Sequence, residues 1–187
     1  MADRLDDIEG QVERRNFVSP PLHLWHPALS GDIPIRIAAD GAWYHEGSVI
    51  RRESLVKLFA SILRREEDGE YYLVTPAEKW RVEVELHPLI VTDVSRATGG
   101  DKPLMQLTLN TGKTVDIGDS HRLFLEPAIG DIPDVQLEHG LSALFSRPAC
   151  IAWLTWRMTG TVRPRSAAAT TRLRYYQTRS NRVYILG

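Results

Sequence analysis

The stretch "DGAWYHEGSVIRRESLVKLFASIL", residues 40–63, decides the fold because its hydrophobic period changes once along its length. Its first part carries two turn dipeptides, D-G and E-G, around "AWYHEGSVI", which is typical of short strands in a meander. From Arg51, apolar residues recur at helical spacing as far as Leu63, which predicts an amphipathic helix. A pair of arginines therefore stands where strand passes into helix. They are either part of a binding site or ordinary surface charge.

A strand pattern returns after "REEDGE". The segments "YYLVT" and "KWRVEVELH" are separated by a short turn, and in the second one apolar and charged residues alternate. This alternation predicts a half-buried strand with one polar face. Glu83 and Glu85 share that face with Arg81. A solvated or salt-bridged face is the favoured interpretation over a pair of carboxylates for acid/base chemistry.

The second half of the chain reads as further short strands followed by a second helix from about Pro148 to Met158. The run "NTGKT", residues 110–114, lacks the first glycine of a phosphate-binding loop and precedes a strand, so we expect a hairpin turn. A short amphipathic helix is expected at residues 3–15. A loop is expected at residues 159–171, and a closing hairpin follows it.

The two halves repeat one order of elements. Each opens with "DIP" and contains strands, an arginine, a helix, a loop and a hairpin that begins "YY". Setting Arg52 on Arg147 places the apolar residues of both helices in the same register. We therefore expect an α+β protein of two small domains from a duplicated strand-strand-helix-strand-strand unit, with antiparallel sheets each packed by one helix. The expected divisions are an N-terminal helix or tail at 1–18, an N-terminal domain at 19–93 and a β-rich C-terminal domain at 94–187; chance resemblance of the halves is the alternative.

Charge is distributed unevenly along the 187 residues. After Glu138 the chain has eight arginines and no acidic residue, so a local charge of +8 balances −9 in the rest of the chain to give the net −1. Such asymmetry is a hint of an anionic partner, and docking of the basic part on the acidic part is the competing interpretation. No apolar run could span a membrane and no secretory signal is present, so a cytoplasmic location is expected.

Catalytic and metal sites are not indicated by any motif. Asp119, Ser120 and His121 are consecutive, so they cannot easily line up as a triad. The histidines lack zinc-ligand spacing, and the single Cys150 lies in an apolar run and reads as a buried thiol. We therefore expect no catalytic residue, no metal and no cofactor. The arginines at the two helix starts add positive charge to the helix N-termini, which suggests an anion site where the two units meet.

The runs "GDIPIRIAADGAWYHEGSVIRRESLVKLFASILRREEDGEYYLVTPAEKWRVEVE" and "HGLSALFSRPACIAWL" resemble the bacterial family called domain of unknown function 1285. The resemblance covers about residues 20–187. It implies two α+β domains that arose by duplication, the second like a pleckstrin-homology fold in outline, and a cleft between them suspected of binding something in signalling. No catalytic residue can be carried over. The motif positions supply these candidate ligand-binding residues: Asp32, Arg36, Trp43, Arg52, Tyr72, Thr75, Lys79, Glu83 and Arg147.

Three functions follow as hypotheses. The favoured one is a non-enzymatic module that binds an anionic small molecule or a protein partner at the interface of its two domains, in signal transduction. The alternative is a nucleic-acid binder that uses the arginine-rich C-terminal third. A hydrolase with a carboxylate and a histidine across the cleft is the third, and formation of a homo-oligomer through an exposed strand edge stays open.

Overall fold

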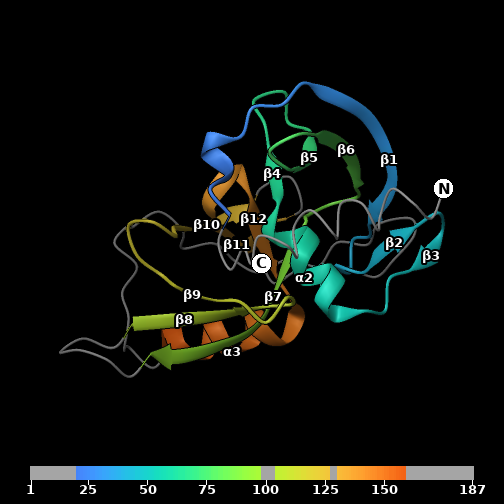
Figure 1. The fold of residues 1–187 in the computed structure, drawn as a ribbon. Coiled ribbons are helices and arrows are strands. Elements are labelled where there is room, and N and C mark those ends of the chain that lie inside the picture. Colours follow the sequence, from blue (N-terminus) through green and yellow to red (C-terminus); the bar gives the residue numbers. More distant parts are fainter. Residues whose placement is uncertain (1–19, 98–103, 127–129, 159–187) are drawn as a thin grey trace. The chain divides into compact units, whose positions relative to one another are not determined.

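The computed structural model describes residues 20–97, 104–126 and 130–158 (Figure 1). Its contacts divide the chain into two units, one comprising Met1–Pro88 with His139–Leu141 and the other comprising Leu89–Glu138 with Ser142–Gly187. The helix expected at residues 3–15 and the loop and hairpin expected after residue 158 lie outside the described residues. Within the described ranges, no helix has the length and apolar character of a membrane span.

The N-terminal unit contains a six-stranded sheet in the order β3-β2-β1-β6-β5-β4. Its strands are β1 (Leu29–Ile37), β2 (Trp43–His45), β3 (Ser48–Val49), β4 (Leu63–Arg65), β5 (Tyr71–Val74) and β6 (Lys79–Val84). Two three-stranded meanders make up the sheet, and β1 and β6 join them as a parallel pair. The short 3-10 helix η1 (Leu22–Leu24) precedes β1 and buries Leu22.

Helix α2 (Glu53–Ser61) is shorter than the helix expected from Arg51 to Leu63. Arg52 is its N-cap residue with extended dihedrals, and Leu63 already belongs to β4, where it pairs with Leu73. The pairing overrides the helical pattern because Leu63 is fully buried in the sheet. Phe59 of α2 is also fully buried and stacks on Trp43 with ring centroids 6.2 Å apart. The helix therefore covers the apolar face expected for it.

The C-terminal unit contains a second six-stranded sheet in the order β10-β11-β12-β7-β8-β9. Its strands are β7 (Leu89–Ala97), β8 (Leu104–Leu109), β9 (Thr114–Asp116), β10 (Leu123–Glu126), β11 (Ile132–Gln136) and β12 (Ser142–Phe145). The short 3-10 helix η3 (Glu138–Gly140) lies between β11 and β12 in the chain. The hairpin turn expected at "NTGKT" is confirmed, since β8 and β9 pair on either side of it.

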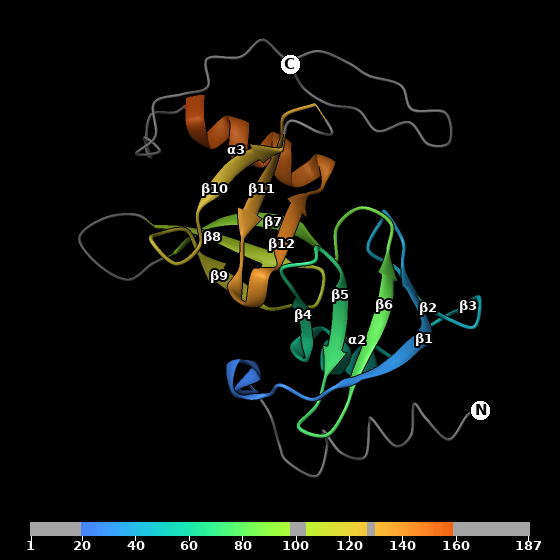
Figure 2. The ribbon, with the colours of Figure 1, turned by 90° about the horizontal axis from the view of Figure 1, so that it is seen from above.

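Helix α3 (Arg147–Met158) follows β12 and packs against β7 and β12 (Figure 2). Trp153 of α3 meets Phe145 of β12 edge to face, with centroids 6.4 Å apart. Strand β7 belongs wholly to the second sheet, so it runs through the division expected between residues 93 and 94. The contacts divide the chain before β7, at Pro88.

The two sheets have the same topology. In each, the first strand of the unit pairs in parallel with the sixth, and the other neighbours are antiparallel. The α+β class and the duplicated two-domain layout are confirmed, although each sheet has one parallel pair and so is not wholly antiparallel. The helices differ in place, because α2 lies between the third and fourth strands and α3 follows the sixth. Arg52 and Arg147 therefore stand at non-equivalent points of the repeat.

Candidate functional site

A groove of about 460 Å³ lies along the parallel pair of the N-terminal sheet. The register of this pair shifts between Asp32, opposite Arg81, and Arg36, opposite Glu83. Strand β1 therefore places three residues where β6 places one, as in a bulge, and a bulge is a common way to redirect side chains at a site. We call this the β1–β6 groove. Its lining is Asp32, Ile33, Pro34, Ile35, Arg36, Glu46, Gly47, Glu70, Arg81, Val82 and Glu83.

Both arginines of the groove are already engaged. The Arg81 Nε donates to Asp32 Oδ1 at 2.6 Å, and this hydrogen bond raises the pKa of Arg81, with Glu70 adding a smaller effect. Arg36 pairs with Glu85, whose other oxygen accepts from the Ala39 N–H at 2.9 Å. The Arg36 guanidinium also lies 4.5 Å from the centroid of the Tyr44 ring. These contacts confirm the salt-bridged interpretation of the charged strand face and leave the remaining groove carboxylates in excess.

The turn between β2 and β3 forms one end of the groove. It is the two-residue loop Glu46-Gly47, with φ of 49° and 79°. Positive φ at both positions is what a type I′ hairpin turn requires, and Asn, Asp or Gly normally occupies the first of them. The Glu46 N–H donates to the Pro34 carbonyl at 2.9 Å, which ties the turn to the irregular part of β1.

A network of paired charges continues from the groove across the same sheet. Arg64, Tyr72, Arg81 and Asp32 stand opposite one another in successive strands β4, β5, β6 and β1. They form one row across four strands. Because Arg81 belongs to both the row and the groove lining, the network supports one wall of the groove.

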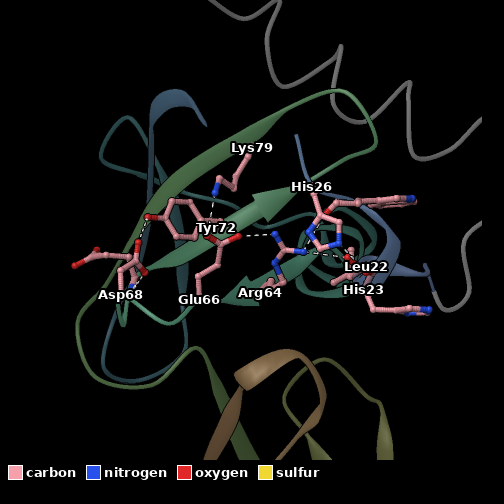
Figure 3. A network of polar contacts seen from close by, with 10 residues as sticks. Leu22, His23, His26, Arg64, Glu66, Asp68, Tyr72 and Lys79 are labelled. Atoms are coloured by element: carbon pink, nitrogen blue, oxygen red, sulfur yellow. Dashed lines mark hydrogen bonds and ion pairs between the residues drawn. The ribbon is translucent and has the colours of Figure 1, made fainter. Parts of the chain in front are cut away.

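Figure 3 shows the polar contacts within the network. Glu66 accepts from Arg64 and, at 2.9 Å, from Lys79 Nζ, which also lies 4.8 Å from the Tyr72 ring centroid. Arg64 Nη1 also donates to the carbonyls of Leu22 and Trp25, at 3.0 and 2.9 Å. The network thereby fixes the η1 segment beside β4. These are structural roles, because every one of these groups has its partner inside the unit.

Three pKa shifts reflect these contacts. The Tyr72 hydroxyl donates to Asp68 Oδ2 at 2.7 Å, and this bond together with burial raises the pKa of Tyr72 to about 12. The same hydrogen bond lowers the pKa of Asp68. Burial tends to raise the pKa of Glu66, but its hydrogen bonds with Lys79 and Arg64 outweigh this effect and lower it.

Three of the residues that the sequence nominated come together in the β1–β6 groove, namely Asp32, Arg36 and Glu83. Tyr72 and Lys79 belong to the adjoining network. Trp43 and Thr75 are buried instead. Trp43 packs in the core, and the Thr75 hydroxyl accepts from the Glu78 N–H at 3.0 Å within the turn between β5 and β6.

The two arginines at the helix starts belong to different units. Arg52 and Arg147 are both exposed, and each has an interaction partner within the molecule. Arg52 serves α2 through its backbone, since its carbonyl accepts from the N–H groups of Leu55 and Val56. The anion site expected where the two units meet stays a prediction.

The sequence interpretation missed Glu46, Glu70 and Arg81 as members of one site. Arg81 was considered as part of the charged strand face and not as a groove residue, and Glu46 only as a turn residue. The available signal was the glutamate itself, because a long acidic side chain is an unusual choice before glycine in a two-residue hairpin turn. No signal in the sequence reports the bulge that opens the groove.

The C-terminal unit contains a buried acid with a strongly raised pKa. Asp134 of β11 is fully buried, and burial raises its pKa to about 6 against the opposing effect of hydrogen bonds from Ser142 and the backbone. Burial likewise raises the pKa of the Cys150 thiol to about 11, which fits the expected inert cysteine. Among the residues that the structure describes, no group of three or more histidine, cysteine or acidic side chains could hold a metal ion.

Fold and site together define a two-unit α+β protein with matching six-stranded sheets and an open, charged groove in the first unit. Two family models match the chain: "Domain of unknown function (DUF1285), N-terminal domain" at residues 20–86, and "Protein of unknown function (DUF1285), C-terminal domain" at residues 88–175. The chain belongs to this family, as its resemblance implied.

Two crystal structures of the same family are similar to the chain. The one from Silicibacter pomeroyi DSS-3 is 38% identical over 76% of this chain and 81% of its own, with a TM-score of 0.65. The one from Shewanella baltica OS155 is 31% identical over 66% of this chain and 91% of its own, with a TM-score of 0.56. No curated protein matches the chain.

Proposed function

We propose that this protein is a non-enzymatic binding module whose ligand lies in the β1–β6 groove. The observation that carries the proposal is the contrast between the two parallel pairs of the molecule. In the C-terminal sheet, Ala143, Leu144 and Phe145 pair with residues 89–91 in continuous register, and all six are buried. The shared topology therefore does not require an opening at this place.

The side chains around the groove are suited to recognition. Both guanidinium groups and the Asp32 carboxylate are held in position by the Arg81–Asp32 and Arg36–Glu85 pairs. Preorganised charges favour binding because the side chains lose little conformational freedom when a ligand arrives. Exposed Pro34 supplies apolar surface, and buried Ile33, Ile35 and Val82 belong to the core beneath the groove. Bacterial signal transduction is the setting that the family resemblance implies for such a module, and the cytoplasm is the location expected from the sequence.

This proposal departs from the anionic ligand that the sequence suggested. The lining has four carboxylates and two arginines, and both arginines are paired with carboxylates. The field in the groove is therefore negative. A ligand at the domain interface, with Arg52 and Arg147 as its anchors, is the competing version. Replacing both arginines with glutamine separates the two, since only the interface version predicts that binding is lost.

Native mass spectrometry of the full chain, purified without denaturation, tests the proposed function. Glu83 is an exposed strand residue, so Glu83→Trp should fill the groove and retain the fold, because aromatic residues suit strands. We expect a bound mass on the wild-type chain that is absent from this variant. Ser54→Trp, on the exposed side of α2, is the control and should keep the ligand. A ligand retained by Glu83→Trp would contradict the proposal.

Nucleic-acid binding is the second candidate, on the strength of the eight arginines after Glu138. Six of them lie after residue 158, outside the described residues. A protein that binds through arginine-phosphate contacts loses affinity steeply as salt rises, because bound counterions are released. Filter binding of a short labelled DNA and RNA at several salt concentrations measures this slope. A flat response at measurable affinity would count against the candidate.

A further inference from the structure

The β1–β6 groove contains two acidic side chains that the rest of the described structure does not use. Glu46 and Glu83 form no ion pair and no side-chain hydrogen bond with a described residue. Glu83 stands opposite Arg36 in the parallel pair, but the Arg36 guanidinium is taken by Glu85 and the Tyr44 ring. These two carboxylates are therefore available to a ligand from outside the unit.

Glu46 stands in a backbone conformation that disfavours it. Its φ of 49° lies in the left-handed region, where a side chain other than that of Asn, Asp or Gly is strained. Gly47 beside it has φ of 79° and nothing within 4 Å of the position of a Cβ atom, so the turn protrudes into open space. Strain held at an exposed position is a reason to look for a function of the side chain.

The shape of the groove indicates the kind of ligand. Most of its charged lining residues are exposed, whereas a small molecule is normally enclosed over most of its surface. An extended chain can lie in an open groove and contact it from one side. The apolar lining residue that is exposed in the groove is Pro34, and it suits the aliphatic stems of lysine and arginine, which pack on apolar surface while their charged ends reach polar partners.

We infer that the β1–β6 groove binds an extended, basic segment of a partner protein, whose lysine or arginine side chains pair with Glu46 and Glu83. This inference rests on the proposed function and adds the class of ligand to it. The stems lie against Pro34, and the cationic ends meet the two available carboxylates. The fixed pairs Arg81–Asp32 and Arg36–Glu85 border the site and repel a cation less than free arginines would.

Fluorescence anisotropy with a short labelled peptide in which arginine alternates with glycine tests the ligand class on the full chain. We expect saturable binding that weakens with salt. Glu46→Gln and Glu83→Gln should each raise Kd by about 3- to 10-fold, as expected for loss of one charge-assisted contact at an exposed site. Glu67→Gln changes an exposed carboxylate outside the groove and should leave Kd unchanged.

Glu46→Asn gives a second readout that a structural role would not produce. Asparagine is favoured at this turn position, so the variant should unfold at a higher temperature than the wild type and yet bind the peptide more weakly. Glu46→Gln retains the strained backbone and removes only the charge. A gain in stability without a loss of affinity would overturn the role of the Glu46 carboxylate.

Three results would overturn the inference: no binding of the arginine peptide, a Kd for both charge variants equal to that of the wild type, or full displacement of the peptide by spermidine at matched charge. The last would mean that the groove takes a small amine. These outcomes are distinct from failure of the proposed function. If a copurified mass is lost from Glu83→Trp while the arginine peptide does not bind, the groove is a ligand site and only the class is wrong.

Discussion

The parallel pairs of the two sheets occupy equivalent places and differ in almost everything else. In the C-terminal unit, β12 and β7 pair without a break through buried apolar residues. In the N-terminal unit, β1 and β6 shift register twice and carry exposed charges on either side of a groove. The order of strands is thus compatible with a closed or an open pair. The side chains and the bulge in β1 decide whether the pair is closed or open.

The two sheets also differ in where their charged groups lie. The N-terminal sheet pairs its ionic groups with one another, from the partly buried Arg64, Glu66 and Lys79 to the exposed Arg81 and Asp32. Among the described residues of the C-terminal sheet, the buried acid is Asp134, and burial raises its pKa to about 6. Surface pairs contribute little to stability, whereas a buried charge is costly. The exposed charges of the first unit can therefore serve recognition at little cost in stability, and the second unit ties part of its stability to pH.

The largest effect is expected from the helix that covers the N-terminal sheet. Phe59→Ala removes a fully buried ring that stacks on Trp43, and we expect a loss of about 3–5 kcal/mol in the free energy of unfolding, measured by urea denaturation. Trp153→Ala should cost a similar amount in the other unit, although α3 occupies a different place in the chain order. Ser54→Ala on α2 is the control. A loss below about 1 kcal/mol for Phe59→Ala would mean that α2 is not part of the core.

The buried acid predicts a pH dependence confined to the C-terminal unit. The pKa of Asp134 is higher in the folded chain, about 6, than its usual 3.8, so the folded state binds the proton more tightly. Its contribution to stability is present below pH 4 and is lost as pH rises through 6. The difference corresponds to about 3 kcal/mol.

Asp134→Asn should flatten this dependence and stabilise the chain above pH 6. Thermal unfolding followed across pH 4–8 measures the effect, and Asp119→Asn at an exposed position serves as the matched control. If wild type and Asp134→Asn lose stability in parallel as pH rises, another group causes the dependence.

A smaller effect is expected where the N-terminal sheet pairs its surface charges. Tyr72→Phe removes the hydroxyl that donates to Asp68, and we expect a loss of about 1 kcal/mol in the free energy of unfolding. The aromatic ring and its contact with Lys79 are retained. In the wild type, spectrophotometric titration should show one tyrosine that ionises only near pH 12. That late phase should be absent from Tyr72→Phe, and its persistence would assign it to another tyrosine.

The smallest effect on stability is expected at the groove itself. Asp32→Asn weakens the pair with Arg81, whose side chains are 70% and 44% exposed, so the loss in free energy of unfolding should stay below about 1 kcal/mol. Such a result from urea denaturation would sharpen the contrast with the buried parallel strands β7 and β12 of the other sheet. A loss of several kcal/mol would show that the groove charges hold the fold together.

The sequence predicted the repeated part of the fold well. Alternation in "KWRVEVELH" located β6 and its polar face, and helical spacing located α2 and α3 to within two residues. It failed at the end of α2, because the pairing of Leu63 with Leu73 is a contact between segments distant in sequence. It also aligned Arg52 with Arg147 on the basis of local order, and only strand pairing reveals that the two helices follow different strands.

The candidate site was predicted only in part. Asp32, Arg36 and Glu83 were nominated and do meet in one groove, while Trp43 and Thr75 proved to be buried. A conspicuous tryptophan in a motif gives no indication of its exposure until its partner, here Phe59, is known. Glu46 was overlooked because its relevance comes from a turn that a hydrogen bond to the Pro34 carbonyl holds beside the irregular part of β1.

Local chemistry in the sequence determined the elements of this protein: where strands alternate, where a helix begins and where glycine permits a turn. The strand order, the parallel pairing of β1 with β6 and the bulge between them come from contacts between residues about fifty positions apart. Those contacts decided which arginines are neutralised and which glutamates are not. The sequence gives the number of charged residues, but the net charge of a site depends on which of them folding brings together.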